Sequence, residues 1–233
     1  MQTNSAVPLT LPQWQDVTVH LPATDHSIHY TFFSLPTVDV DNNYQAAPNH
    51  VIICLHGSYQ TCHTWDDFAT HLNASCTSSL HLYCMDLRGH GDSEGSKNGI
   101  YTLDVFADDL HAFIETVMFP RYSSAKLTLI GMSLGGLAVL RYISQPHLVK
   151  QLNNSKLILH AAVIVDIAHS VAKQQQAKSV IQEQMKQTVE MDEFEDFVKW
   201  AHGNNPTRSI DNLRQRLRYS LKQLPHNGKW TWK

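Results

Sequence analysis

The first 35 residues contain two segments in which apolar and polar side chains alternate. They are WQDVTVHL (residues 14–21) and SIHYTFFSL (residues 27–35). Alternation with a period of two is typical of a strand with one buried and one exposed face. Because the connection between them is short, the sequence predicts an antiparallel pair. The polar residues 36–49 that follow predict a surface loop.

From His50 onward, short apolar runs alternate with longer segments of helical spacing. The runs cover residues 51–57, 80–86, 126–131 and 161–168, and the helical segments cover residues 64–76, 102–118 and 134–144. An unbroken apolar run such as VIICLHG predicts a strand buried on both faces. Strands that alternate with helices form βαβ units with right-handed crossovers. We therefore predict an α/β fold, a mostly parallel sheet with flanking helices, in a core of residues 1–170.

Residues 171–224 contain no further buried strand and have helical spacing. Gly203 predicts the end of one helix, and Ser209 and Pro225 predict the two ends of another. The tail HNGKWTWK has an Asn-Gly turn signal followed by alternation. The three predicted helices are KSVIQEQMKQTV (178–189), DEFEDFVKW (192–200) and SIDNLRQRLRYSLKQL (209–224).

Composition and charge narrow the function classes. The 233-residue chain is 42% hydrophobic and 17% charged, as in a folded globular protein, and its net charge of −3 favours neither nucleic acid nor an anionic membrane as a partner. The late cluster of basic residues has helical spacing and predicts a solvated helix face rather than a phosphate-binding surface. Its members are Arg208, Arg214, Arg216, Arg218 and Lys222.

The cellular compartment is predicted from the targeting signals, membrane spans and paired cysteines that the sequence lacks. The N-terminus lacks the features of a signal or transit peptide, and no apolar segment has the length of a membrane span. The cysteines form no C-x-x-C pair, and Cys54 and Cys84 stand in apolar runs that predict core positions. We therefore expect a reduced, cytoplasmic protein.

The segment KLTLIGMSLGGLAVLRYI (residues 126–143) contains the chemistry-bearing motif. Its Gly131-x-Ser133-x-Gly135 pattern follows a buried strand and begins an apolar helix. This strand–turn–helix setting is that of a nucleophile elbow, in which a strained serine needs small neighbours. The serine also stands at a helix N-terminus, where free N–H groups favour developing negative charge. The alternative is an ordinary serine that caps a helix.

Together, HG (56–57), DLRGHGDS (86–93), GMSLGG (131–136) and VDIA (165–168) resemble the α/β-hydrolase superfamily, from about residue 14 to the chain's end. The resemblance implies a serine esterase of the AB hydrolase-1 type, with Ser133 as nucleophile and residues 171–224 as a helical cap. It also implies an oxyanion hole formed by the N–H groups of Ser58 and Leu134, beside His56 and Gly57.

Several polar side chains near the motif have structural alternatives. We expect His56 and His90 to form structural hydrogen bonds, and Asp86 and Asp92 to hold their loop through bonds to the backbone. A metal site is not expected, because no ligand spacing is present; the residues considered for it are Cys54, His56, Cys62 and His63.

The acid and the base of a triad are less well defined. Asp166, after a strand, is a candidate acid, since active sites lie at the carboxyl edge of parallel sheets. The resemblance also allows an acid after the next strand, beyond Lys233, and Asp166 would then be a helix cap. The resemblance implies a base on a loop after the eighth strand, near the end of the chain. None of the later histidines follows a late strand, so we expect the base to be absent. Roughly 60–80 residues, including the seventh and eighth strands, would then be missing after residues 225–233. These histidines are His147, His160, His169, His202 and His226.

The sequence thus predicts a hydrolase of small carboxylic esters that needs no cofactor and is inactive without its histidine. Two alternatives remain. One is a non-catalytic truncated product that binds a small ligand or a protein partner. The other is an acyltransferase or protein methylesterase on the same fold. The substrate and the oligomeric state are not predicted.

Overall fold

The structure, a computed structural model, describes residues 14–35, 48–76, 78–155, 157–167 and 189–233. Within these ranges a six-stranded sheet has the order β1-β2-β4-β3-β5-β6, in which β1 and β2 are antiparallel and β4, β3, β5 and β6 run parallel. This confirms the predicted α/β fold. The strands are β1 (Trp14–Leu21), β2 (His26–Leu35), β3 (His50–Leu55), β4 (Leu80–Met85), β5 (Ala125–Met132) and β6 (Leu157–Val165).

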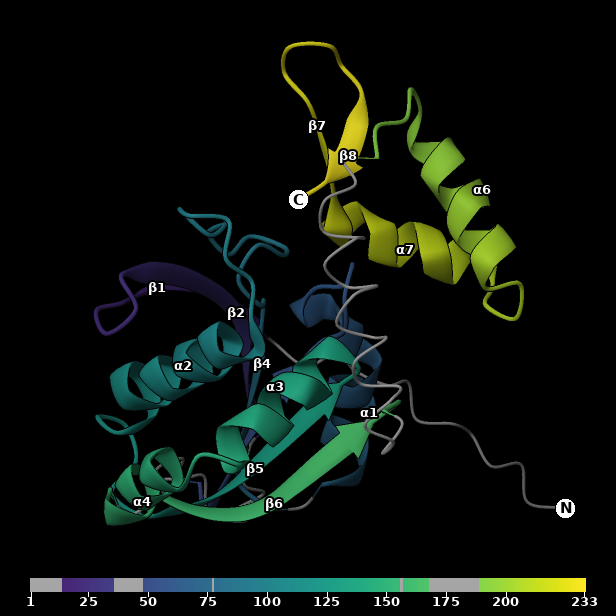
Figure 1. The fold of residues 1–233 in the computed structure, drawn as a ribbon. Coiled ribbons are helices and arrows are strands. Elements are labelled where there is room, and N and C mark those ends of the chain that lie inside the picture. Colours follow the sequence, from purple (N-terminus) through teal and green to yellow (C-terminus); the bar gives the residue numbers. More distant parts are fainter. Residues whose placement is uncertain (1–13, 36–47, 77, 156, 168–188) are drawn as a thin grey trace, which may run out of the picture.

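Helices cover both faces of the sheet (Figure 1). The side chains of α2 (Leu103–Phe113), α3 (Leu134–Ile143) and α4 (Pro146–Asn154) pack on one face. On the other face lies α1 (Asp66–Ser75), which a 3₁₀ turn, η1 (Cys62–Trp65), precedes. The side chain of Thr102 caps α2 by accepting a hydrogen bond from the Val105 N–H. A π-helical turn, η2 (Ile114–Met118), follows α2.

Strand β3 shows why its sequence is an unbroken apolar run. Val51, Ile53 and Leu55 belong to the core on the α2–α3–α4 face, whereas Ile52 and Cys54 belong to the core on the α1 face. Successive side chains of a strand point to opposite faces, so a strand covered on both sides needs apolar residues at every position. Cys54 and Cys84 are both fully buried, as predicted.

Strand β6 is longer than predicted and lies at the edge of the sheet. It begins at Leu157 rather than Ala161, and a bulge at His160 shifts its register, so that Leu159 pairs with Leu127 and Ala161 with Thr128. Such a bulge breaks the apolar pattern from which a strand is predicted. In the described part of the chain β6 pairs only with β5. Several of its apolar side chains are exposed, among them Ile158, Val163 and Val165.

Residues 189–233 form a C-terminal unit with its own small core. It contains α6 (Phe194–Asn204), α7 (Ile210–Ser220) and a hairpin of β7 (Leu221–Gln223) and β8 (Trp230–Trp232). Ser209 caps α7 as predicted, whereas α6 continues through Gly203 instead of ending there. Most of the helix predicted over residues 178–189 lies outside the described residues. That residues 171–224 act as a cap stays a prediction.

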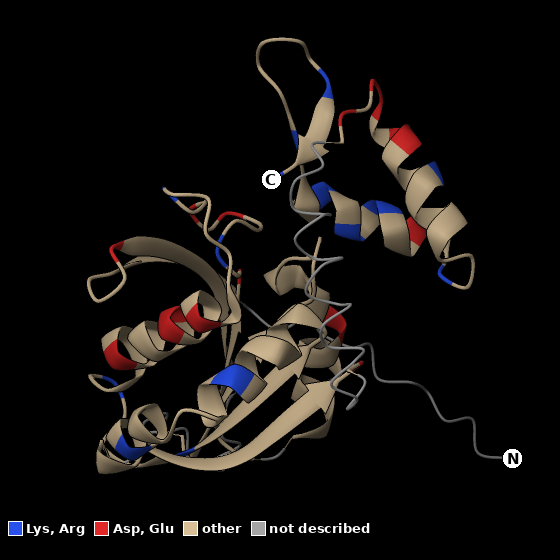
Figure 2. Ribbon diagram, in the orientation of Figure 1, with Lys and Arg blue, Asp and Glu red and all other residues tan. Residues whose placement is uncertain are grey.

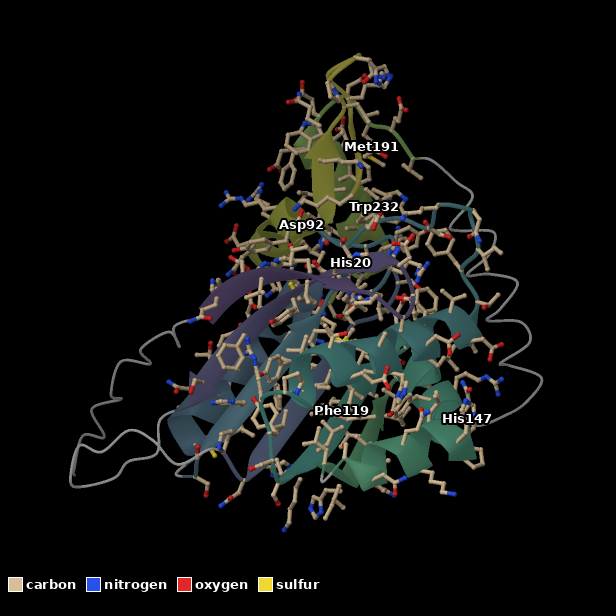
Figure 3. All side chains as sticks on the ribbon, turned by 90° about the vertical axis from the view of Figure 1, so that its left-hand side faces the viewer. His20, Asp92, Phe119, His147, Met191 and Trp232 are labelled. Atoms are coloured by element: carbon tan, nitrogen blue, oxygen red, sulfur yellow. The ribbon has the colours of Figure 1, made fainter. Side chains whose placement is uncertain are left out.

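The C-terminal unit contacts the loop after β3 and the loop after β4. The rings of His63 and Tyr219 stack with centroids 3.6 Å apart, and Nζ of Lys233 lies 2.8 Å from a carboxylate oxygen of Asp92. Figure 3 shows Asp92 and Trp232 at this junction, with His147 of α4 near the opposite end of the molecule. None of the helices built from described residues has the length and apolarity that a bilayer crossing requires.

Candidate active site

Ser133 stands between the last residue of β5 and the first residue of α3. Its φ of 48° and ψ of −112° lie in a region that residues other than glycine rarely adopt. Two hydrogen bonds hold this backbone: the Ser133 N–H donates to the Val165 carbonyl and the Leu137 N–H donates to the Ser133 carbonyl, both at 2.9 Å. Strain of this kind costs about 1–3 kcal/mol and persists only where the surroundings impose it.

Gly131 and Gly135 allow the chain to turn this sharply. A Cβ built on Gly131 would lie 2.5 Å from the Gly135 carbonyl oxygen, and one built on Gly135 would meet the carbonyl oxygens of Leu55 and His56. Backbone atoms cannot yield as a flexible side chain would, so neither position tolerates a larger residue without movement. The G-x-S-x-G spacing is therefore required by close packing of β5, α3 and β3.

The loop after β3 is attached to this turn. The Gly135 N–H donates to the His56 carbonyl at 3.0 Å, and a Cβ built on Gly57 would lie 3.3 Å from Cβ of Ser133. As the first residue of α3, Leu134 has an N–H that the helix leaves free. Among the described residues, the Ser58 N–H has no hydrogen-bond acceptor either. Their role as oxyanion donors stays a prediction.

His56 is a buried, neutral residue that supports this loop. Its Nε2 accepts a hydrogen bond from the Leu87 N–H at 3.0 Å, so its Nδ1 carries the proton and donates to the Gly57 carbonyl at 2.7 Å. Burial, followed by the nearby His90, lowers the pKa of His56 to about 4. The ring is thus uncharged near neutral pH, and the structure agrees with the expected hydrogen-bonding role.

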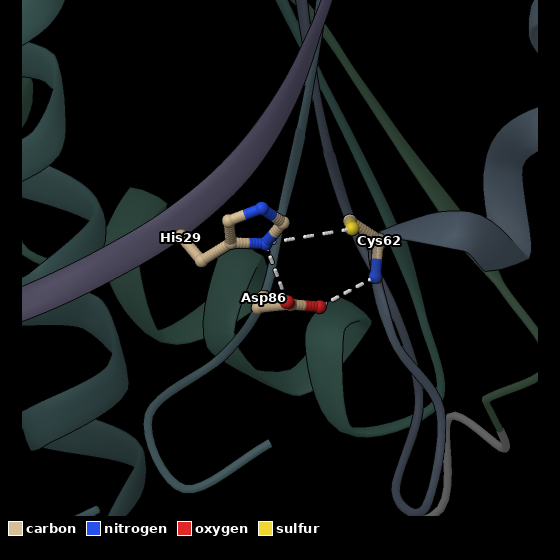
Figure 4. Close-up of side chains that lie close together, drawn as sticks. All are labelled: His29, Cys62 and Asp86. Carbon is tan, nitrogen blue, oxygen red and sulfur yellow. Dashed lines mark hydrogen bonds and ion pairs between the residues drawn. The ribbon is translucent and has the colours of Figure 1, made fainter. Parts of the chain in front are cut away.

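Asp86 joins three segments of chain (Figure 4). One carboxylate oxygen accepts the Cys62 N–H at 2.6 Å, and the other accepts the Asp92 N–H at 3.0 Å and the His29 Nδ1–H at 2.8 Å. Asp86 therefore holds its loop through backbone bonds, as predicted. Asp92 does not: its own carboxylate pairs with Lys233.

The ionised form of Asp86 and the protonated form of His29 stabilise each other. Burial opposes ionisation of Asp86, but the hydrogen bonds it accepts outweigh burial, so the pKa of Asp86 lies below its ordinary value. Burial likewise opposes protonation of His29, yet Asp86 raises the pKa of His29 overall. Burial, with the neighbouring Asp86, raises the pKa of the Cys62 thiol.

The spacing of residues in the sequence did not reveal that His29, Cys62 and Asp86 lie together in the fold. Nδ1 of His29, Sγ of Cys62 and a carboxylate oxygen of Asp86 lie within 4.8 Å of one another, which is a possible ligand set for a metal ion. They come from β2, η1 and the end of β4, so only the folded sheet brings them together. The hydrogen bonds of Asp86 to His29 and to the Cys62 N–H satisfy the cluster without an ion.

Asp166 follows the last residue of β6 and is exposed. Its φ is 58°, a left-handed value that aspartate adopts more readily than most residues. The residue before it, Val165, accepts the hydrogen bond from the Ser133 N–H, so the two backbones run side by side at this edge. The structure thus brings Asp166 near the elbow, and its role as triad acid stays a prediction.

The later histidines make other contacts. His160 packs edge-on against His50 with ring centroids 5.6 Å apart, and Nδ1 of His202 lies 3.2 Å from the Arg208 carbonyl. His147 belongs to α4 and His226 to the turn between β7 and β8. No hydrogen bond from a histidine to Ser133 occurs within the described ranges. His169 lies outside them.

A mostly parallel sheet with helices on both faces and a strained serine at a strand–helix turn is the arrangement of an α/β hydrolase, and the family match confirms the superfamily predicted from the sequence. Residues 46–228 match the family described as serine aminopeptidase, S33, and the chain belongs to that family.

The relatives found by comparison are mainly esterases and hydrolases. Over 188 residues the chain is 27% identical to esterase Rv0045c of Mycobacterium tuberculosis, covering 78% of this chain and 55% of that protein. Over 217 residues it is 21% identical to the probable protein phosphatase methylesterase 1 of Dictyostelium discoideum, covering 85% and 62%. A solved structure of Rv0045c superimposes with a TM-score of 0.65 at 23% identity, covering 96% of this chain and 65% of that one. The chain thus spans only part of each relative.

Proposed function

We propose that this chain carries the nucleophile of a serine esterase that cleaves small carboxylic esters through an acyl-enzyme on Ser133. The observation that carries the proposal is the backbone of Ser133, whose strained conformation with positive φ is supported by the close approach of Gly131 and Gly135 to neighbouring backbone atoms. Such strain at a strand–helix turn presents Oγ for attack on a carbonyl carbon. The esterases among the relatives support the same reaction class.

The proposed reaction has two halves. Oγ of Ser133 attacks the ester carbonyl, the tetrahedral intermediate loses the alcohol, and water then hydrolyses the acyl-serine. The Ser58 and Leu134 N–H groups would stabilise the oxyanion by about 3–4 kcal/mol each. Asp166 is the proposed acid that orients a histidine base.

The absence of a histidine bonded to Ser133 in the described part of the chain supports a second element of the proposal: alone, the chain turns over slowly. Loss of a key triad member costs on the order of 10⁶ in turnover. Free imidazole contains the same basic ring as a histidine side chain. Adding it should therefore restore part of the missing proton transfer.

The test measures p-nitrophenol release from p-nitrophenyl acetate, with and without imidazole, by the chain and by two variants. Ser133→Ala removes the proposed nucleophile. Ser144→Ala is the matched control, because Ser144 lies at the other end of the same helix and bonds only the Arg141 carbonyl. With imidazole present, we expect the native chain and Ser144→Ala to release p-nitrophenol faster than Ser133→Ala does. Equal rates in all three proteins would overturn the esterase proposal in favour of a non-catalytic chain.

A further inference from the structure

A cavity of about 180 Å³ lies between the loop after β3 and the C-terminal unit. Its wall on the core side includes Ser58 and His63, and its wall on the opposite side includes Leu217 of α7 and Trp232 of β8. An apolar cavity of about 150 Å³ is large enough for benzene. This cavity therefore has room for one short branch of a small molecule.

Arg208 and Arg216 also line the cavity. The basic cluster predicted to form a solvated helix face is therefore only partly solvated. Figure 2 shows the basic residues along α7. Arg214 pairs with the exposed Glu195 and Asp211, and Arg218 is exposed, as predicted. Arg216 instead lies on the side of α7 that faces the core, and the side chain of Arg208, just before α7, reaches the same space.

The charge of these arginines is incompletely balanced. The Arg216 guanidinium donates to the Thr64 carbonyl at 3.4 Å and lies 3.6 Å from Asp67, whose side chain is 72% exposed. No carboxylate within the described ranges forms an ion pair with Arg208. Burial, then the charge of Arg208, lowers the pKa of Arg216, with Asp67 and Asp66 acting in the opposite direction. An anion in the cavity would relieve this repulsion.

The cavity adjoins the candidate active site. Ser58, whose N–H is a proposed oxyanion donor, lines it, and the preceding Gly57 packs close to the side chain of Ser133. A molecule whose ester carbonyl lies at Ser133 could therefore place a short acyl chain along Leu217 and Trp232. The end of that chain would meet the two guanidinium groups.

We propose that this cavity is a subsite for a carboxylate, so that the preferred substrates are monoesters of short dicarboxylic acids. The proposal rests on the esterase function proposed above, because it assigns the acyl group of that substrate. Planar guanidinium groups bind carboxylates through paired, charge-assisted hydrogen bonds. The apolar part of the wall accommodates the methylene groups between the two acid functions.

The test compares binding of monomethyl glutarate with that of methyl pentanoate, in which a methyl group replaces the carboxylate. Affinities are measured by NMR titration of the Ser133→Ala chain, which prevents reaction. We expect at least about tenfold tighter binding of the anionic ester, and loss of this preference in Arg216→Gln and in Arg208→Gln. Arg218→Gln, on the solvated side of the same helix, should keep it. Arg216→Lys, which retains the charge, should keep part of it.

Equal binding of the two esters, or an unchanged preference in both Arg→Gln variants, would overturn the subsite. Thermal unfolding of each variant identifies any that fails to fold. The imidazole-assisted reaction at Ser133, measured on the same arginine variants with Ser133 intact, separates the two proposals. Reaction at Ser133 without a carboxylate preference would refute only the subsite, whereas a carboxylate preference without that reaction would refute the esterase and its substrate assignment and leave a carboxylate-binding cavity.

Discussion

Ser133 and Asp166 both have a positive φ but very different surroundings. The φ of Ser133 is 48° and that of Asp166 is 58°. Ser133 is fixed by two backbone hydrogen bonds and by glycines packed against three carbonyl oxygens, whereas Asp166 is exposed at the end of the edge strand β6. We call the surroundings of the proposed nucleophile, Ser133, the nucleophile side, and those of the proposed acid, Asp166, the acid side. The comparison teaches that the fold imposes the conformation of Ser133, whereas Asp166 lacks comparable support among the described residues.

The largest expected effect tests the Asp86 cluster, which anchors the nucleophile side. Asp86→Ala should destabilise the fold by about 3–5 kcal/mol, because it leaves buried His29, the buried Cys62 N–H and the partly buried Asp92 N–H without their acceptor. Urea denaturation measures this, with the exposed Asp211→Ala as control. A loss below about 1 kcal/mol would mean that the cluster does not hold these loops.

The next effect tests packing at the elbow. Gly135→Ala should cost about 3 kcal/mol, because its Cβ would meet the backbone oxygens of Leu55 and His56. Gly203→Ala is the matched control: Gly203 lies in α6 with nothing near its Cβ position, so alanine there should stabilise by about 0.5–1 kcal/mol. The same denaturation experiment compares them. Equal effects would contradict the close packing of the elbow.

Much of the nucleophile side was predictable from sequence, because it depends on local rules. Unbroken apolar runs identified the parallel strands, and Ser133 between two glycines identified the turn. The cluster of His29, Cys62 and Asp86 was not predictable, since its members are far apart in the chain and meet only through the strand order β2-β4-β3.

The C-terminal unit shows a second limit of sequence patterns. Spacing predicts that α7 is a helix, but it does not tell which of its arginines faces a cavity. That choice depends on the loop of residues 58–64, against which α7 packs. Helix α4 was also not predicted, because only two residues separate the end of α3 from Pro146, where the helical path resumes.

A smaller effect is expected on the pH dependence of the free energy of unfolding, through His56, which supports the loop that carries Ser58. The pKa of His56 is about 4 in the fold against an ordinary 6.5, so the unfolded chain binds a proton that the fold does not. Stability from His56 is complete above about pH 6.5 and declines by about 2–3 kcal/mol as the pH falls toward 4.

Denaturation of the native chain and of His56→Gln at neutral pH and near pH 4 isolates this contribution. We expect a smaller acid-induced loss in His56→Gln, whereas the exposed His147→Gln should follow the native chain. His29, whose pKa is raised, contributes with the opposite sign in all three proteins, so it cancels in the comparison. Parallel pH profiles for native and His56→Gln would show that His56 is not held neutral.

The smallest effect is expected on the acid side. Asp166→Asn should change the free energy of unfolding by no more than about 0.5 kcal/mol, because the side chain is exposed and asparagine also adopts left-handed conformations. Urea denaturation tests this. A loss above about 2 kcal/mol would show that Asp166 is as firmly integrated as Ser133 and would remove the contrast between the two sides.

The most direct measurement of whether Ser133 is a preformed nucleophile is the site at which a fluorophosphonate reacts, determined by mass spectrometry of peptides from the folded 233-residue chain. We expect a single adduct on the peptide that contains Ser133, formed faster when imidazole is present and absent from Ser133→Ala. An adduct that persists unchanged in Ser133→Ala, or that is spread evenly over several serines, would contradict the assignment.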